Sequence, residues 1–173
     1  MINTRVWFFS MVLLLQACSS SSVVNVDPAA SQSIAPDSVV YVARFEGPPE
    51  YVDAATDFFV AELEGRIANS VVAGTARSQE PMDGYNGGSI APESLLMQDA
   101  KANGADILIM GKVAGHSTTG RLYGFSTVHV FDVGSGKQIA NFHRSKGNAA
   151  ALNVHQAIMA AVERTAEDTA SVF

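Results

Sequence analysis

The chain has 173 residues, of which 47% are hydrophobic and 16% are charged, and its formal net charge is −6. This length and composition predict one globular domain with its own core, since single domains usually contain roughly 100–200 residues. The acidic balance and the lack of a Lys/Arg cluster along the sequence exclude nucleic-acid binding as the function. They also argue against adhesion to anionic lipid through a basic patch.

The N-terminal segment has the pattern of an export signal. One positive charge, Arg5, precedes the apolar run VWFFSMVLLL at residues 6–15. About ten apolar residues are too few to cross a bilayer, which takes ~20, but they fit the hydrophobic region of a signal peptide. The small residue Ala17 follows after Gln16, as at the end of a secretory signal. We therefore expect residues 1–17 to be a signal peptide.

The single cysteine, Cys18, follows directly in the stretch LQAC at residues 15–18. This stretch resembles the bacterial lipobox, although Gln16 replaces the usual small residue. The resemblance implies cleavage between Ala17 and Cys18 and a covalent lipid on Cys18, with no other cofactor. Ser19 stands where an enterobacterial inner-membrane retention signal shows Asp, which implies an outer-membrane anchor facing the periplasm. The alternative is a chance cysteine beside an ordinary cleavage site.

Residues 18–37 predict a lipidated cysteine followed by a flexible tether. The segment is rich in Ser, Ala, Pro and Asp and has no sustained period. A flexible coil of ~20 residues has a root-mean-square span of roughly 25 Å, enough to hold a domain clear of a membrane. The alternative is that Val23, Val24 and Val26 form an edge strand. We expect the globular periplasmic domain to comprise residues 38–173.

The first half of this domain predicts a strand, a helix and a second short strand. The β-branched and aromatic run VVYVARF at residues 39–45 is typical of a strand. Two prolines then precede residues 51–69, whose apolar side chains recur every three or four positions, so an amphipathic helix is expected. Residues 71–73 predict a short strand.

A polar, glycine-rich stretch at residues 74–89 predicts a long loop, and such loops in compact domains are usually functional or disordered. Within it, we take Met82, Asp83, Tyr85 and Asn86 as candidate partner-binding residues.

The second half of the domain predicts a helix, three strands and a closing helix. Pro92 starts the helix, which runs to residue 103, and Gly104 follows as a left-handed cap. Residues 105–113 predict a central strand buried on both faces. Residues 122–133 and 137–143 predict a hairpin with a turn at 134–136. Asn148 is the expected cap of the last helix, which runs to about residue 172.

These elements follow the order β-α-(β)-α-β-β-β-α. The order predicts an α/β fold, an α+β sandwich in which helices pack on a mixed, partly antiparallel sheet.

A search for catalytic or metal-binding patterns gives one weak candidate. The sequence GSGK at residues 134–137 lacks the spacing of a phosphate-binding loop, and no GxSxG elbow is present. On the predicted hairpin, His129 opposes Asn141 and His143 opposes Thr127, so the two histidines are diagonal neighbours. A metal or pH-sensing pair at His129 and His143 is one reading, and ordinary strand residues the other. We predict a protein that is not an enzyme.

The order of motifs resembles a family of periplasmic lipoprotein domains that includes CsgG, LpoB, PelC and the N-terminal domain of TolB. The motifs are the lipobox, the strand VVYVARFEG, the phrase AKANGADILIMGKV, the hairpin VHVFDVGSGKQIANF and the closing helix. The resemblance implies an α/β sandwich and a non-enzymatic envelope accessory protein. Some members form rings that serve export, and others regulate a cell-wall synthase.

The expected function is therefore that of an outer-membrane-anchored binding and assembly module of a cell-envelope machine, with protein partners and a homo-oligomeric ring as possible assemblies. One alternative is a structural lipoprotein of a flagellar or pilus base. Another is a metal-binding or hydrolytic protein that uses His129 and His143.

Overall fold

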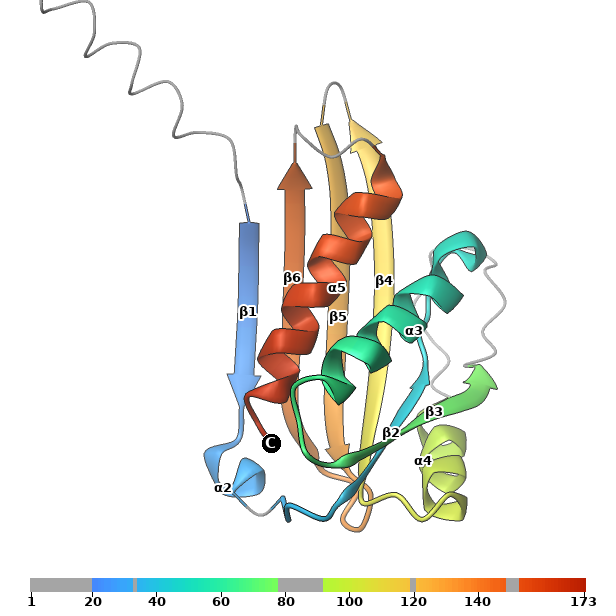
Figure 1. Ribbon diagram of the computed structural model, residues 1–173, viewed down its shortest axis with the longest axis vertical. Coiled ribbons are helices and arrows are strands. Elements are labelled where there is room, and N and C mark those ends of the chain that lie inside the picture. The colour runs from blue at the N-terminus through green and yellow to red at the C-terminus, as the bar shows by residue number, and fades with distance from the viewer. Residues whose placement is uncertain (1–19, 33, 78–91, 119–120, 149–152) are drawn as a thin grey trace, which may run out of the picture.

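A computed structural model describes residues 20–32, 34–77, 92–118, 121–148 and 153–173. Its centre is a six-stranded mixed sheet with the strand order β1-β6-β5-β4-β2-β3 (Figure 1). The strands are β1 (Ser20–Val26), β2 (Val39–Arg44), β3 (Ser70–Arg77), β4 (Ile107–Thr118), β5 (Arg121–Asp132) and β6 (Gln138–Asn148). The helices are α2 (Pro28–Ser31), α3 (Pro49–Glu64), α4 (Pro92–Ala102) and α5 (Val154–Ala170). The α/β fold and the mixed sheet are thus confirmed.

Two kinds of strand pairing make up the sheet. Strands β4, β5 and β6 form an antiparallel meander, and β1 adds to it antiparallel to β6. Strands β2 and β3 run parallel to β4 and reach the sheet through helical crossovers. The turn between β5 and β6 is tight, with Gly136 at a φ of 70°. Asp132 accepts hydrogen bonds from the backbone and hydroxyl of Ser135 there, and these bonds lower the pKa of Asp132.

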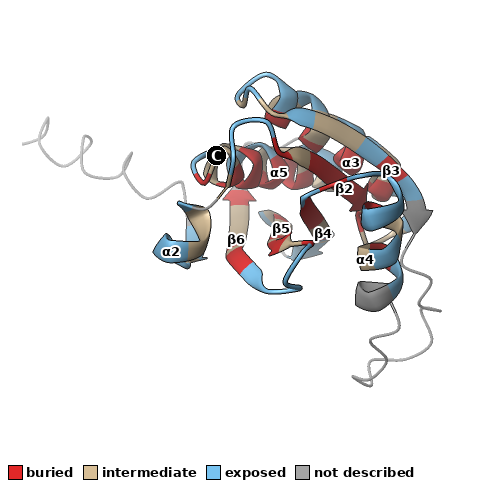
Figure 2. Ribbon diagram, turned by 90° about the horizontal axis from the view of Figure 1, so that it is seen from below, coloured by how far each residue is buried: buried red, intermediate tan, exposed pale blue. Residues whose placement is uncertain are grey.

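Helices cover the sheet unequally on its two faces. Helices α3 and α5 pack together on one face, over a core that includes Val40, Phe59, Ile109, Phe142 and Ile158. Helix α4 packs on the opposite face, over a smaller core of Tyr41, Leu96, Leu108, Phe131 and their neighbours. Figure 2 shows α4 on the other side of the sheet from α3 and α5. Alternation along β2 and β4 supplies both cores, which is why Ile107, Leu108 and Ile109 are all buried, as predicted for a central strand.

Helix α5 lies very close to the sheet because two glycines face each other beneath it. Gly115 of β4 pairs directly with Gly124 of β5. A Cβ atom at Gly124 would lie 2.1 Å from the backbone carbonyl atoms of Ala157, and one at Gly115 would lie 2.5 Å from Val154 Cγ1. Two residues further along β5, on the same face, Ser126 hydrogen-bonds the buried Thr165 hydroxyl at 2.8 Å. The helix therefore seats its backbone directly on the strand surface.

An ion pair fixes the other end of α5 to the sheet. The guanidinium of Arg144 on β6 donates to both carboxylate oxygens of Asp168, one of them at 2.6 Å. Both side chains are largely shielded, and the carboxylate raises the pKa of Arg144. Such bidentate pairs are among the stronger charge interactions in proteins.

The starts of the helices and the Gly104 cap follow the sequence, with one correction. Helix α3 starts at Pro49 and α4 starts at Pro92, and Gly104 adopts a φ of 70°, as a left-handed cap requires. Asn148 is not the cap of α5 but the last residue of β6. The cap is Asn153, whose side chain accepts a hydrogen bond from the backbone of Gln156 at 2.9 Å. The two asparagines, five residues apart, offer the same capping chemistry. Asn148 pairs with Leu122 of β5, so Asn153 caps the helix.

The tether predicted for residues 18–37 is also corrected. Residues 20–26 form the edge strand β1, paired with β6 through seven register positions from Ser20↔Lys146 to Val26↔Ala140. Val26 packs against the main core, and the Ser21 and Ser145 hydroxyls hydrogen-bond at 2.7 Å. The reason is that β6 would otherwise present a bare edge, which a segment with three valines can cover although it lies far away in the sequence.

Several elements differ from their expected lengths. Strand β4 runs to Thr118 and β6 to Asn148, five residues beyond the predicted ends, and β3 continues to Arg77 into the expected loop. Helix α3 ends at Glu64 rather than residue 69. Among the described residues, no helix is both long and apolar enough to span a membrane.

Candidate functional site

Helix α4 covers only part of its face of the sheet. Beyond α4, this face of strands β4, β5 and β6 is not covered by any helix in the described part of the chain. Side chains on this face come from alternate positions, because neighbouring residues of a strand point to opposite sides. On β5 these are Tyr123, Phe125, Thr127 and His129, while Gly124 and Ser126 face α5. The open side of β5 therefore carries its aromatic residues.

Four aromatic rings form a row across this open side. His116 of β4 stacks on Tyr123 with ring centroids 5.0 Å apart and on Phe125 at 5.4 Å. Phe125 in turn lies 6.3 Å from the ring of His143 on β6. Val23 of β1 pairs with His143 and extends the row to the sheet edge. We call these five residues, His116, Tyr123, Phe125, His143 and Val23, the aromatic face.

The aromatic face is accessible but held in place. His116 is exposed, the other three rings are half-buried, and Val23 is 57% exposed. Thr127 fixes the ring of His143 through a 2.8 Å hydrogen bond to Nδ1. A row of stacked rings on paired strands loses little side-chain freedom on binding, and aromatic residues are enriched in the cores of protein interfaces. This surface is therefore suited to contact with another protein.

Next to the aromatic face lies a polar atom without a partner. Asn141 on β6 has a buried Oδ1 that accepts no hydrogen bond. Asn141 pairs with His129 on one side and with Asn25 on the other. Buried polar atoms are normally hydrogen-bonded, so the unpaired Oδ1 of Asn141 is unusual.

The predicted register of the two histidines is confirmed. His129 pairs with Asn141, and Thr127 pairs with His143, so both histidines lie on the open side of the sheet as diagonal neighbours. They have different surroundings, since His143 bonds Thr127 and stacks with Phe125, whereas His129 lies 6.3 Å from the ring of Phe131. Across the described ranges, no group of three His, Cys, Asp or Glu side chains could hold a metal ion.

The other predicted site residues lie outside the described residues. These are Ala17 and Cys18 at the expected cleavage and lipidation site, and Met82, Asp83, Tyr85 and Asn86 in the expected binding loop. Their roles remain predictions.

Two aspartates near α4 have structural partners. Asp99 accepts a hydrogen bond from the hydroxyl of Tyr41, whose ring is buried, and burial together with this carboxylate raises the pKa of Tyr41. Asp106 accepts from the backbone of Val39 at 2.9 Å and so joins the start of β4 to β2. These contacts connect α4, β2 and β4.

Sequence reasoning did not find the aromatic face. The signal was present in the alternation YGFSTVH at residues 123–129, which places every aromatic ring on one side of a strand. Such alternation normally puts the apolar side inward, but here glycine, serine and valine take the side under α5.

No protein-family model matches the sequence, and no curated protein matches it. Several solved structures match its fold. PelC from Paraburkholderia phytofirmans, crystallised as a dodecamer, gives a TM-score of 0.63 at 12% identity, over 87% of this chain and 96% of PelC. The LpoB C-terminal domain from Salmonella enterica gives 0.45 at 17% identity, over 68% and 92%. TolB from Acinetobacter baumannii gives 0.41 at 10% identity, over 87% of this chain and 31% of TolB.

The sequence-based resemblance is thus confirmed at the level of fold by the match to PelC. At such low identity, the PelC match carries the shared fold and nothing finer. Over 87% of its length, this chain has the fold of PelC.

Proposed function

We propose that the chain is a cell-envelope lipoprotein, anchored to the outer membrane through Cys18, that acts as a non-enzymatic binding and assembly module. In this proposal, copies of the chain associate with one another through the aromatic face. The observation that carries the proposal is the likeness in fold to PelC, which was crystallised as a dodecamer. The LQAC stretch at residues 15–18 supports the anchor.

The aromatic face supports self-association by its chemistry. It combines half-buried rings with the exposed Val23 at a sheet edge. On the same side of the sheet, the described parts of β4, β5 and β6 that lie beyond α4 contain no carboxylate. Interface cores are typically depleted in charge and enriched in aromatic residues. The edge of β1 beside it also offers unpaired backbone groups, which can pair with a second chain.

The assembly is tested by measuring the mass of the chain from Cys18 onward with light scattering. The wild-type chain should be a multimer, and Phe125→Glu should weaken association by at least about tenfold, because a buried carboxylate would lack a partner. Leu95→Glu is the matched control, since Leu95 is 61% exposed on α4, away from the aromatic face. Val23→Glu provides a second disrupting variant at a side chain that does not contribute to the core. A wild-type monomer at tens of micromolar would contradict self-association.

The anchor is tested separately in cells. We expect Cys18→Ser to move the protein from the membrane fraction to the soluble fraction, because each buried CH₂ of an acyl chain contributes about 0.8 kcal/mol to anchoring. Ser19→Asp is the matched variant, which should stay in the membrane fraction but shift toward the inner membrane in an enterobacterial host. If Cys18→Ser stays in the membrane fraction, the anchor is wrong.

A further inference from the structure

Charge is unevenly distributed over the described residues. The chain as a whole carries 17 acidic and 11 basic side chains. Yet none of the described residues 20–26, 111–118, 121–131, 138–148 and 153–162 is Asp or Glu, and four of them are Lys or Arg. These segments are spread along the sequence, but the fold places β1, β6, β5 and β4 side by side, and two of the four cations, Arg121 and Lys146, lie toward the end of the sheet where β1 begins. A sequence without a basic cluster therefore folds into a domain with a basic end.

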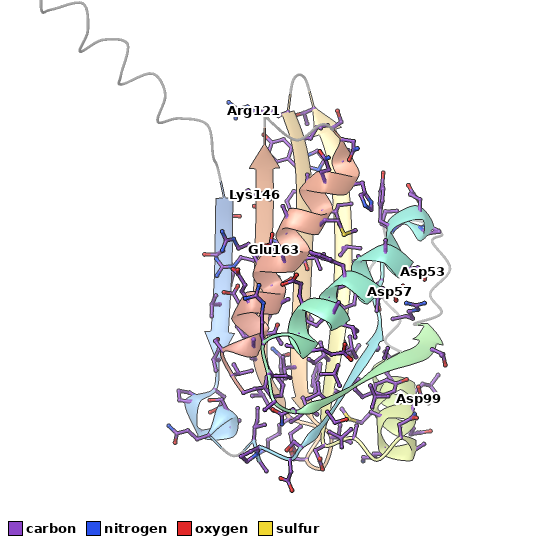
Figure 3. All side chains as sticks on the ribbon, viewed as in Figure 1. Asp53, Asp57, Asp99, Arg121, Lys146 and Glu163 are labelled. Carbon is purple, nitrogen blue, oxygen red and sulfur yellow. The ribbon has the colours of Figure 1, made fainter. Side chains whose placement is uncertain are left out.

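Two cations stand at this end without an acidic partner. Arg121 opens β5, and Lys146 lies near the end of β6 (Figure 3). Within the described part of the chain, neither has a carboxylate within 4.0 Å, unlike Arg144, which pairs with Asp168. The figure shows Asp53, Asp57 and Asp99 further down the molecule. We call Arg121, Leu122 and Lys146 the basic end.

The strand register defines how far the basic end projects. Ser20 pairs with Lys146, and Lys146 pairs with Gly124, so these three residues lie at one level of the sheet. Arg121 lies three residues beyond Gly124, or about 10 Å further at ~3.3 Å per residue. Thr118 pairs with Arg121. The β4–β5 hairpin therefore extends past the start of β1.

The basic end is bounded on one side by α3. Tyr51 near the start of α3 lies with its ring 6.0 Å from that of His155 near the start of α5. Glu50 precedes Tyr51, so an acidic residue lies at this margin. On the other sheet face, Lys112 lies 4.0 Å from Glu46 and is thereby partly neutralised. At this end of the sheet, the described cations without a carboxylate within 4.0 Å are therefore Arg121 and Lys146.

The chain leaves the sheet at this same end. Cys18 precedes Ser20 by two residues, so its Cα lies no more than about 7 Å from that of Ser20, whatever the path. A lipid on Cys18 would hold the start of β1 beside the bilayer, since β1 replaces the expected tether. This step rests on the proposed anchor.

We propose that the basic end docks on the anionic headgroups of the membrane that holds the protein. Lys and Arg close to an anionic bilayer each favour binding by about fivefold, and the effect falls off within a Debye length. The neighbouring Leu122 is apolar and fits the boundary between headgroups and acyl chains. Docking would stand the long strands upright on the membrane, with the β5–β6 turn pointing away.

The test separates docking from native lipidation by attaching the anchor chemically. The chain from Cys18 onward contains every described residue and has a single cysteine, so it can be coupled to a maleimide lipid in vesicles. It has no tryptophan, because the single one is Trp7. Leu122→Trp then reports on the basic end, and Ser135→Trp in the exposed β5–β6 turn reports on the opposite end. The measurement is fluorescence quenching by brominated lipids.

We expect Leu122→Trp to be quenched several-fold more in vesicles with phosphatidylglycerol than in vesicles of phosphatidylcholine alone. Ser135→Trp should not be quenched in either kind of vesicle. Adding the charge reversals Arg121→Glu and Lys146→Glu should abolish the difference, with about a fivefold loss in the docking equilibrium for each cation removed. The matched control reverses two exposed lysines elsewhere, Lys101→Glu and Lys137→Glu, with the same change in net charge, and should leave the difference intact.

Three results would overturn the proposal. They are equal quenching on neutral and anionic vesicles, loss of the difference in the control reversal, and stronger quenching of Ser135→Trp. If Arg121→Glu and Lys146→Glu instead lower the mass of the multimer without affecting quenching, the basic end contacts another copy, and lipid docking is wrong. Because the anchor is chemical, failure here leaves the native anchor untouched, and Cys18→Ser tests that anchor alone.

Discussion

Gly124→Ala is expected to destabilise the fold by about 3 kcal/mol or more, near the upper end for overpacking of a core. The added methyl would lie 2.1 Å from the carbonyl carbon and oxygen of Ala157 and 2.3 Å from the nitrogen of Ile158. All three are backbone atoms of α5, so no side-chain rotation relieves the contact and the helix must move away from the sheet. The free energy of unfolding, measured by urea denaturation, checks this result.

Alanine substitutions at two other glycines are expected to destabilise the fold less than Gly124→Ala and serve as comparisons. Gly115→Ala should destabilise less than Gly124→Ala, because its added methyl meets side-chain atoms of Val154 and Ile158, which can shift. Gly134→Ala should change stability by less than about 0.5 kcal/mol, since the nearest atom is 3.5 Å away at an exposed turn. Equal stability of the Gly124→Ala and Gly134→Ala variants would contradict the close seating of α5.

A chain that begins at Ser38 is expected to be less stable than one that begins at Ser20 and to aggregate. Removing β1 exposes the edge of β6, and it also removes the half-buried Val26 that packs against the core, a contribution of up to about 1.5 kcal/mol. A long bare edge invites pairing with other chains. Urea denaturation and light scattering on the two chains check the expectation.

A point variant separates the loss of β1 from the loss of the residues that follow it. Asp27 donates its backbone N–H to Ile139 at 2.9 Å, and antiparallel pairs alternate, so Asn25 donates to Asn141 in the same way. Asn25→Pro in the chain from Ser20 removes that donor while keeping every other residue. It should reproduce part of the destabilisation. If both altered chains match the stability of the chain from Ser20, β1 contributes nothing to the fold.

Much of the domain after residue 38 was predictable because its signals are local. The stripe that includes Val52, Phe59 and Leu63 gives α3 its buried side, and Gly104 ends the turn after α4. The turn at residues 134–136 fixed the hairpin register well enough to pair His129 with Asn141. Each of these signals depends on residues close together in the sequence.

The missed features depend on distant residues. The segment SSSVVNV alone does not decide between a tether and the edge strand considered for Val23, Val24 and Val26, since its pairing is determined by β6, more than a hundred residues later. The aromatic face gathers side chains from four strands, and no single stretch shows that α4 stops short of them. The expected sites at Cys18 and in the loop containing Tyr85 lie outside the described residues, so the structure adds nothing to either.

The edge strand β1 also limits the reach of an anchored molecule. With a lipid on Cys18, the domain has no slack chain between itself and the bilayer, and its longest described strands, β4 and β5, have 12 residues each and span about 40 Å. A tethered domain can search a wide volume for a distant target, but this one would stay within its own height of the membrane. Any partner would have to come to that thin layer, and it would meet the protein in one fixed orientation.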